Sequence, residues 1–320
     1  MPRFDVTTYG EGGLRLSVPV GSRIETTNVF EVDVSATEAN VLGALSRLGW
    51  RCGWFSALPA TAPGRRVAHA FRVAGIDLSA VHWREQGRIG CYYVEYAEPP
   101  RATTVLYDRK DTCFAQLPLA DVDWGYLLDT RHIHLTGLTY PLSDNTAAII
   151  PAIVSRAREA GVTLSFDVNH RSLLWSVAEC RERLLPLFRH IDLLFCSRRD
   201  AANVFGCEGS PEQAATQLLE LSGAAEVVMS LSDDGVLAAG AAGIQRHAAH
   251  PVKVVDRIGA GDALAAGVLH GWLKGDLSTG LRYGTAMAAL AMSQRGDMVI
   301  THAQELDALI NGPAGQDIQR

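Results

Sequence analysis

The sequence predicts an α/β fold in which helices cover both faces of a mostly parallel β-sheet, with a small β-sheet projecting from its edge as a lid. Two observations lead to this prediction. Short apolar runs typical of buried strands alternate along the chain with helical segments, which is the order that builds a parallel sheet between layers of helices. Two other ranges, about residues 12–34 and 86–112, are rich in runs that alternate polar and apolar residues, as strands with one covered face do.

Each main element follows from its own pattern. A helix is predicted at residues 145–160, because helical spacing there stops at Gly161. Ligands of parallel sheets bind at the carboxyl ends of the strands, so functional residues are expected just after strands. Buried strands are predicted at residues 133–135, 163–168, 191–195 and 227–229.

The length and composition limit the classes of protein. The 320 residues suggest one large domain or two ordinary ones, and we expect a single domain over residues 1–320 that contains the lid strands. The chain is 48% hydrophobic and 20% charged, so it can build a sizeable core. Its net charge of −6, without a basic stripe, argues against nucleic acid as a partner.

Three further features point to the compartment. No apolar run reaches the ~18 residues of a membrane span, and the N-terminus lacks the apolar region of a secretion signal. The six cysteines lack the spacing of a metal site and are expected to be reduced packing residues. We therefore expect a cytoplasmic protein with no membrane partner.

A glycine turn carries the main functional signal. An apolar run at residues 252–255 is followed by Gly-Ala-Gly-Asp at 259–262, and helical spacing then continues over 263–274 up to Gly275. Small residues at a helix start let backbone N–H groups converge on an anion, and the helix dipole adds positive charge there. A carboxylate at position 262 can accept the proton of an attacking hydroxyl. The spacing alone fits equally a simple turn with a favourable helix-start residue.

The motif at residues 256–262 resembles the second signature of the ribokinase-like carbohydrate kinases. The resemblance implies that Asp262 is the catalytic base and that the N–H groups of Gly259, Ala260 and Gly261 hold the transferring phosphate. Within that family the chain most resembles the 2-keto-3-deoxygluconate kinases. This closer resemblance runs from Gly10-Glu11 to Arg295-Gly296-Asp297 and includes Gly90-Cys91-Tyr92-Tyr93-Val94-Glu95, Tyr107-Asp108-Arg109, Phe166-Asp167-Val168-Asn169-His170-Arg171 and Leu174-Trp175.

The candidate substrate residues follow from this resemblance and from their chemistry. Arg171 comes just after the strand at 163–168, and a guanidinium can clamp a carboxylate with two parallel hydrogen bonds. The alternative is a surface arginine paired with a nearby aspartate. Tyr92 and Tyr107 lie on the expected lid strands and match substrate contacts of the family, although both could be ordinary strand packing. Arg109 is expected either to reach the ligand or to pair with Asp108 or Asp111.

The first signature of the family differs in this chain. The family usually has two glycines here, followed by a short run that ends in asparagine. This chain has Ser35 and Ala36 in place of the glycines, and it keeps Asn40. Glycines give a lid hinge freedom and let the backbone approach a sugar. The substitution therefore affects the identity of the substrate more than the chemistry.

The nucleotide site is expected along the ends of two other strands. Ser197 and Asp200 stand where the family has an Asn-x-x-Glu motif that organises Mg²⁺ through water, so Asp200 is the candidate for an indirect metal contact. Ser197 is alternatively a helix cap. The loop that carries Ser230, Ser232 and Gly235 is the expected nucleotide loop.

Asp256 opens the glycine turn. It is included among the nucleotide-binding candidates, and the resemblance places a monovalent cation near it.

Together with the resemblance, these residues imply phosphoryl transfer from ATP, with Mg²⁺, to a small sugar acid, foremost 2-keto-3-deoxygluconate at its 6-hydroxyl. A kinase for a neutral ketose such as fructose, or for a nucleoside, is a second interpretation, which Arg171 disfavours. A sugar-binding protein of the same fold without turnover is a third, which the intact turn disfavours. Because a lid sheet has exposed edges and one bare face, we also expect a homodimer formed through the lid.

Overall fold

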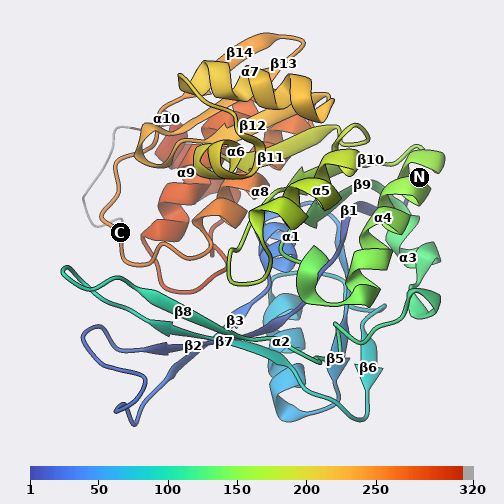
Figure 1. Ribbon diagram of the computed structural model, residues 1–320, viewed down its shortest axis with the longest axis vertical. Helices are drawn as coiled ribbons and strands as arrows, with labels where there is room; N and C mark the ends of the chain where they lie inside the picture. The colour runs from blue at the N-terminus through green and yellow to red at the C-terminus, as the bar shows by residue number, and fades with distance from the viewer. Residues whose placement is uncertain (313–320) are drawn as a thin grey trace.

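The large β-sheet of the computed structural model, which describes residues 1–312, has eight strands in the order β14-β13-β12-β11-β10-β9-β1-β4 (Figure 1). Neighbouring strands pair in parallel from β12 to β4, whereas β13 pairs antiparallel with both β12 and β14. The mostly parallel sheet is therefore as predicted. The strands are β1 (Phe4–Tyr9), β4 (Cys52–Phe55), β9 (Thr130–Thr136), β10 (Thr163–Asp167), β11 (Leu193–Ser197), β12 (Glu226–Ser230), β13 (Val236–Gly240) and β14 (Gly243–His247).

Helices cover both faces of this sheet, and each face has its own core. Along β11, Leu194 and Cys196 belong to one apolar cluster, whereas Leu193 and Phe195 belong to the other, because alternate side chains point to opposite faces. The first cluster is closed by α3 (Trp124–Leu128), α4 (Asp144–Glu159), α5 (Val177–Phe188), α6 (Arg198–Phe205) and α7 (Pro211–Ser222). The second is closed by α1 (Thr37–Arg47), α2 (Ala62–Val73), α8 (Ala260–Trp272), α9 (Leu277–Met292) and α10 (Ala303–Asn311).

The predicted elements agree with the structure to within a few residues. The helix predicted at 145–160 is α4, which begins with a capping box between Ser143 and Thr146 and ends before Gly161 in a left-handed conformation. The helix after the glycine turn begins at Ala260, three residues earlier than its apolar spacing indicates. The apolar run at 252–255 forms no strand and is largely exposed.

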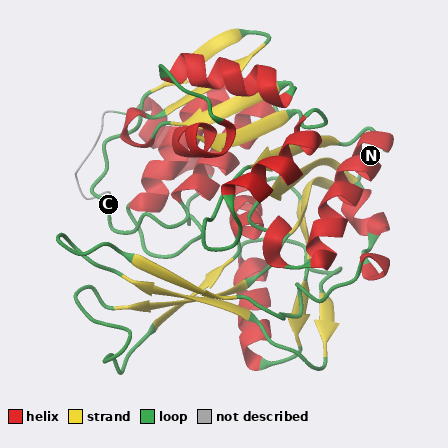
Figure 2. Cartoon of the chain, viewed as in Figure 1, coloured by secondary structure: helices red, strands yellow, loops and turns green. Residues whose placement is uncertain are grey.

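A second sheet of four strands projects from the body of the molecule (Figures 1 and 2). We call it the lid sheet. Its order is β3-β2-β7-β8; β2 and β7 pair in parallel, and the two outer pairs are antiparallel. Its strands lie in the two ranges that the alternating pattern indicated: β2 (Gly13–Val18), β3 (Glu31–Ser35), β7 (Gly90–Glu95) and β8 (Thr104–Asp108). A parallel pair, β5 (Ala57–Pro59) and β6 (His82–Arg84), forms a third, smaller sheet.

Two smaller expectations concern the whole chain. Within residues 1–312, no helix combines the length and the apolar character that crossing a bilayer requires. All six cysteines are free thiols, and five of them are buried, which fits the packing role expected for them.

Candidate active site

A cavity of about 370 Å³ lies between the lid sheet, the carboxyl ends of β10, β11 and β12, and the start of α8. It brings together side chains from segments far apart in the sequence, as the position of ligands at strand ends predicts. Twelve of the residues predicted for the site line it: Ser35, Ala36, Tyr92, Tyr107, Arg109, Arg171, Ser197, Asp200, Ser230, Gly259, Gly261 and Asp262. Five others lie outside its lining: Asn40, Ser232, Gly235, Asp256 and Ala260.

The glycine turn has the geometry of an anion-binding helix start. Gly259 is left-handed, with φ of 85°, and a Cβ there would lie 1.8 Å from the backbone oxygen of Asp297. Only glycine adopts this left-handed conformation freely and has no Cβ to collide with that oxygen. A Cβ at Gly261 would meet no protein atom within 4 Å, so the space beside it opens into the cavity. The first N–H groups of α8 therefore face a space that an anion can fill.

Asp262 lies in the first turn of α8, beside that space. The side-chain amide of Asn40, from α1, donates a hydrogen bond of 2.8 Å to Oδ2 of Asp262. Burial raises the pKa of Asp262 well above its ordinary value, and Asp167 and Asp297 raise it further. The Asn40 hydrogen bond and the charge of Arg171 act in the opposite direction. A carboxylate in this position can take a proton from a hydroxyl close to the glycine turn.

Two acidic side chains, Asp167 and Asp200, line the cavity on the side of β10 and β11. Burial, followed by the nearby charge of Asp200, raises the pKa of Asp167 to about 7. A divalent cation between Asp167 and Asp200 would favour the charged form of Asp167, and carboxylate oxygens are the ligands that Mg²⁺ prefers. Within residues 1–312, no three acidic, histidine or cysteine side chains are grouped to hold a metal directly. The site therefore fits a magnesium ion that keeps several waters.

The cationic residues predicted for the substrate have different surroundings. Arg171 is exposed to the cavity and forms no ion pair with any residue of the described range 1–312, so the alternative of a surface salt bridge is not what the structure shows. Arg109 lines the cavity too, but its Nε lies 2.5 Å from buried Glu11. The expected partners Asp108 and Asp111 were wrong, since Asp108 pairs with Arg88 instead.

The two lid tyrosines face each other across β7 and β8. Tyr92 and Tyr107 are paired in the antiparallel register, and their ring centroids are 6.0 Å apart. Tyr107 lines the cavity. The hydroxyl of Tyr92 donates a hydrogen bond of 2.6 Å to Asp297, so it supports that carboxylate in addition to facing the cavity.

The expected nucleotide residues divide into two groups. Ser230 and Ser197 line the cavity, and Ser197 also caps α6, because its Oγ accepts a hydrogen bond from the backbone N–H of Asp200. The helix-cap alternative for Ser197 is therefore correct. Ser232 and Gly235 belong to the tight connection between β12 and β13 instead of the cavity wall. Gly235 is required there because a Cβ would lie 2.1 Å from the backbone oxygen of His247.

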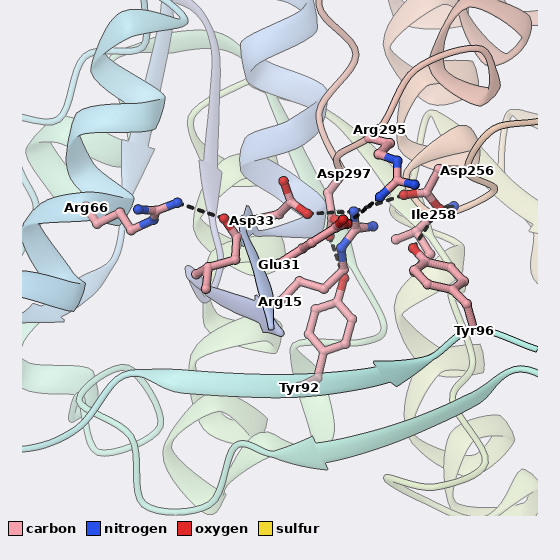
Figure 3. A network of polar contacts seen from close by, with 11 residues as sticks. Arg15, Glu31, Asp33, Arg66, Tyr92, Tyr96, Asp256, Ile258, Arg295 and Asp297 are labelled. Carbon is pink, nitrogen blue, oxygen red and sulfur yellow. Dashed lines mark hydrogen bonds and ion pairs between the residues drawn. The ribbon is translucent and has the colours of Figure 1, made fainter. Parts of the chain in front are cut away.

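Asp256 is not available as a nucleotide ligand. Its Oδ2 lies 2.9 Å from the guanidinium of Arg15, and its Oδ1 accepts hydrogen bonds from Tyr96 Oη and from the N–H of Ile258 (Figure 3). The carboxylate is 3% exposed and does not line the cavity. Its charge is thus balanced by a side chain of the protein, which corrects its assignment to the nucleotide site.

Sequence reasoning missed several residues that line the cavity. Asp297 and Glu11 belong to motifs that carried the resemblance, but nothing in the sequence assigns them to a wall of the site. Arg257 was within the signature itself, and Arg199 within the segment that replaces Asn-x-x-Glu. Asp167 stands at the carboxyl end of β10, where ligands of parallel sheets bind, so its position marks it as a candidate. The others are joined to the site only by the fold. The missed acidic and arginine residues are Glu11, Asp167, Arg199, Arg257 and Asp297.

Comparison with known proteins gives a consistent result. The family model described as pfkB family carbohydrate kinase matches residues 37–303. The chain is 33% identical to 2-dehydro-3-deoxygalactonokinase from Haloferax volcanii over 309 residues, which are 96% of this chain and 97% of that protein. The crystal structure of 2-dehydro-3-deoxygluconokinase from Thermotoga maritima matches with a TM-score of 0.88 and 28% identity, covering 97% of this chain and all of that chain.

One further solved structure shares the fold at lower identity. It is that of a ribokinase II from E. coli in complex with ATP and Mg²⁺, with a TM-score of 0.87 and 23% identity over 96% of this chain and 99% of that one. The fold is thus the ribokinase-like α/β fold. This chain therefore belongs to the pfkB family of carbohydrate kinases, the ribokinase-like family that its motifs predicted.

Proposed function

We propose that the protein transfers the terminal phosphoryl group of ATP to a hydroxyl of a 2-keto-3-deoxy sugar acid, such as 2-keto-3-deoxygluconate (also called 2-dehydro-3-deoxygluconate) or its galactonate epimer. One observation carries the proposal. A single cavity holds the carboxylate of Asp262 beside the glycine turn and the guanidinium of Arg171, which forms no ion pair within residues 1–312. A base, a phosphate-binding turn and a carboxylate clamp are the three parts that this reaction requires.

The reaction assigns one task to each part. The sugar hydroxyl attacks the γ-phosphorus of ATP, the bond from that phosphorus to the bridging oxygen breaks, and ADP leaves with the electron pair. Asp262 accepts the hydroxyl proton. The N–H groups of Gly259, Ala260 and Gly261 hold the equatorial oxygens of the transferred group, and Arg171 holds the carboxylate of the acid.

The remaining cavity residues position the substrates. Tyr107 and Tyr92 cover the sugar from the lid sheet, Arg109 is fixed by Glu11, and Ser35 and Ala36 narrow the hinge side of the cavity. Closure of the lid sheet would exclude water, which competes with the sugar as phosphoryl acceptor.

Ser197 and Ser230 are proposed to contact the nucleotide, while Asp200 and Asp167 would hold Mg²⁺ through water. When bound there, the ion would supply positive charge to neutralise the transferred group and the leaving ADP. No monovalent cation is included at Asp256, because the guanidinium of Arg15 already balances that carboxylate.

The relatives support a sugar acid as acceptor. The names of the Haloferax volcanii and Thermotoga maritima proteins both state a 2-dehydro-3-deoxy sugar acid, and they differ in the epimer. An assay of ADP release with both epimers, with 5-dehydro-2-deoxygluconate, with fructose and with a nucleoside tests the proposal. Turnover with either 2-dehydro-3-deoxy acid at least about tenfold above the neutral acceptors is the expected result, since one carboxylate clamp is worth a few kcal/mol. Preference for fructose or the nucleoside would contradict it.

We further propose that the protein is a homodimer that associates through the lid sheet. The loops and strands of this sheet expose apolar side chains, among them Val20, Val29, Phe30 and Leu106. Its outer strands β3 and β8 leave edges that a second copy can pair with or cover. Light scattering across micromolar concentrations is expected to give twice the mass of one chain, and a monomer at all concentrations would contradict the proposal.

A further inference from the structure

Arg15 places a buried positive charge at the centre of three carboxylates. The residue lies on β2 of the lid sheet, and its side chain is 2% exposed. Its guanidinium nitrogens lie 2.9 Å from carboxylate oxygens of Asp33, Asp256 and Asp297 (Figure 3). Asp33 comes from the neighbouring strand β3, whereas Asp256 opens the glycine turn and Asp297 follows α9. The guanidinium thus joins the lid sheet to two segments of the body.

The two carboxylates from the body depend on Arg15 more than Asp33 does. Asp256 and Asp297 are each 3% exposed, whereas Asp33 is 34% exposed and reaches water. A buried carboxylate without a counter-ion is strongly unfavourable, and two of them in one place repel each other. No other arginine or lysine of the described chain pairs with Asp256 or Asp297. Arg15 therefore supplies the positive charge that both require.

Asp256 and Asp297 are also the supports of the glycine turn. Asp256 accepts a hydrogen bond of 3.1 Å from the N–H of Ile258, within the turn itself. The backbone oxygen of Asp297 lies so close to Gly259 that a Cβ there would be 1.8 Å away. Displacement of either aspartate would therefore move the backbone that presents the N–H groups of Ala260 and Gly261.

Several side chains of the lid sheet contact Asp256 and Asp297. Arg15 on β2 is paired in register with Tyr92 on β7, and the Tyr92 hydroxyl donates a hydrogen bond of 2.6 Å to Asp297. Tyr96, just after β7, donates a hydrogen bond of 3.0 Å to Asp256. The two central strands of the lid sheet thus contact both supports of the turn. Arg15 itself does not line the cavity, so it acts on the reaction only through other residues.

We propose that Arg15 is a positioning residue that makes the anion-binding shape of the glycine turn depend on the seating of the lid sheet. With the lid seated, one guanidinium holds Asp256 and Asp297 in place and the turn is ready for the phosphate. With the lid displaced, the two buried carboxylates lose their counter-ion and the turn relaxes. Phosphoryl transfer is thereby restricted to the closed site, where water is excluded. The inference rests on the proposed kinase function of the same site.

The chain offers a matched control for this proposal. Arg295 also joins the body to the lid sheet, through an ion pair with Glu31 on β3, but this pair is exposed and touches neither Asp256 nor Asp297. If Arg15 only tethered the lid sheet, Arg15→Ala and Arg295→Ala would lower kcat equally. The proposal predicts that kcat for ADP release falls at least about tenfold in Arg15→Ala, since small misplacements of a catalytic group have effects up to ~10²-fold. It predicts kcat within about twofold of wild type in Arg295→Ala, as for an exposed ion pair.

Recovery of activity by added guanidinium distinguishes a positioning role of Arg15 from a general loss of structure in Arg15→Ala. Arg15→Ala leaves a space bounded by three carboxylates, so guanidinium chloride at concentrations well below those that unfold the protein is expected to restore part of its kcat. Wild type and Arg295→Ala are not expected to gain. A merely structural defect would not recover with guanidinium. If Arg15→Ala does not yield folded protein, Arg15→Lys is measured instead; one ammonium cannot reproduce the two-nitrogen bridge, so kcat equal to wild type would overturn the proposal.

A binding measurement keeps the test independent of the acceptor sugar. Mg²⁺ with AMP-PNP, a non-transferring ATP analogue, is expected to raise the Tm of wild type and Arg295→Ala by the same amount and that of Arg15→Ala by less. Absence of turnover with every sugar acid would refute the proposed function and leave this comparison intact. Equal Tm shifts in Arg15→Ala and wild type, or no shift in wild type, would overturn the role of Arg15.

Discussion

The side-chain amide of Asn40 lies 2.8 Å from the carboxylate of Asp262 and donates a hydrogen bond to it, joining the first signature of the chain to its glycine turn. The two residues are 222 positions apart in the sequence. Because the amide can only donate through its nitrogen, the bond stabilises the charged form of the carboxylate, which is the form that a base must have.

Removal of this hydrogen bond is expected to move the pH dependence of the reaction. In Asn40→Ala the pKa of Asp262 rises, so the acid limb of kcat/KM shifts to higher pH by about one to two units, since a hydrogen bond to a charged group is worth ~1.5–3 kcal/mol. Asn203→Ala, on the exposed side of α6, serves as the control and is expected to leave the limb unchanged. A shift in the opposite direction would contradict the assignment of Asp262 as base.

The two glycines of the turn are expected to respond differently to alanine. In Gly261→Ala the new methyl meets no protein atom and alanine suits a helix better than glycine, so Tm stays the same or rises. The methyl nevertheless enters the space for the phosphate, and kcat/KM is expected to fall by at least about tenfold, as for the loss of one oxyanion contact.

In Gly259→Ala, strain from the left-handed backbone and the contact with Asp297 lowers both Tm and activity. Thermal unfolding and steady-state kinetics of both variants check this contrast. Wild-type kinetics in Gly261→Ala would place the phosphate elsewhere.

The acidic pair beside β10 predicts a dependence of stability on pH. The folded-state pKa of Asp167 is about 7 and its ordinary value is 3.8, so the folded protein binds the extra proton between these values. The stability that this proton gives is complete below about pH 4 and is lost as the pH rises through 7.

Asp167→Asn is expected to remove this loss of stability at high pH, because asparagine cannot ionise. Without Mg²⁺, the variant is expected to match wild type in free energy of unfolding near pH 4 and to exceed it by a few kcal/mol near pH 8, from ~1.4 kcal/mol per pKa unit. Exposed Asp233→Asn controls for the loss of one negative charge. An equal difference between Asp167→Asn and wild type at both pH values would contradict the raised pKa.

Arg171 is expected to discriminate acidic from neutral substrates. In Arg171→Ala, kcat/KM for a 2-dehydro-3-deoxy sugar acid is expected to fall by about 10²-fold, because a bidentate charged contact is lost. Any weak activity with a neutral sugar should change little. Equal losses with acidic and neutral substrates would remove the carboxylate role from this residue.

The sequence predicted the local parts of the site better than the contacts between them. The strand-helix alternation and the two alternating ranges are local patterns, and the fold and the lid sheet agree with them. The order of motifs indicated the family, and the family model confirms it. Asp262 and the glycines lie next to each other in the chain, so their spacing could be interpreted before their surroundings were known.

Contacts between distant segments could not be predicted in this way. Arg109 pairs with Glu11, 98 residues away, and not with the neighbouring aspartates that the sequence suggested. Arg15 stands on a strand whose alternation indicated only a covered face, and its partners Asp256 and Asp297 come from the other end of the chain. Nothing local distinguishes a buried arginine from an exposed one, because burial depends on what the fold places opposite it.

The role of Asp262 as the base is tested most directly by the kcat for ADP release from ATP and a 2-dehydro-3-deoxy sugar acid, measured for wild type and for Asp262→Asn. Asparagine keeps the size of the side chain and its place beside Asn40, so the fold and the binding of ATP should persist while the base is lost. We expect turnover by wild type and a fall of about 10²-fold or more in the variant, the scale of general-base catalysis. Near-wild-type turnover by Asp262→Asn would contradict that role.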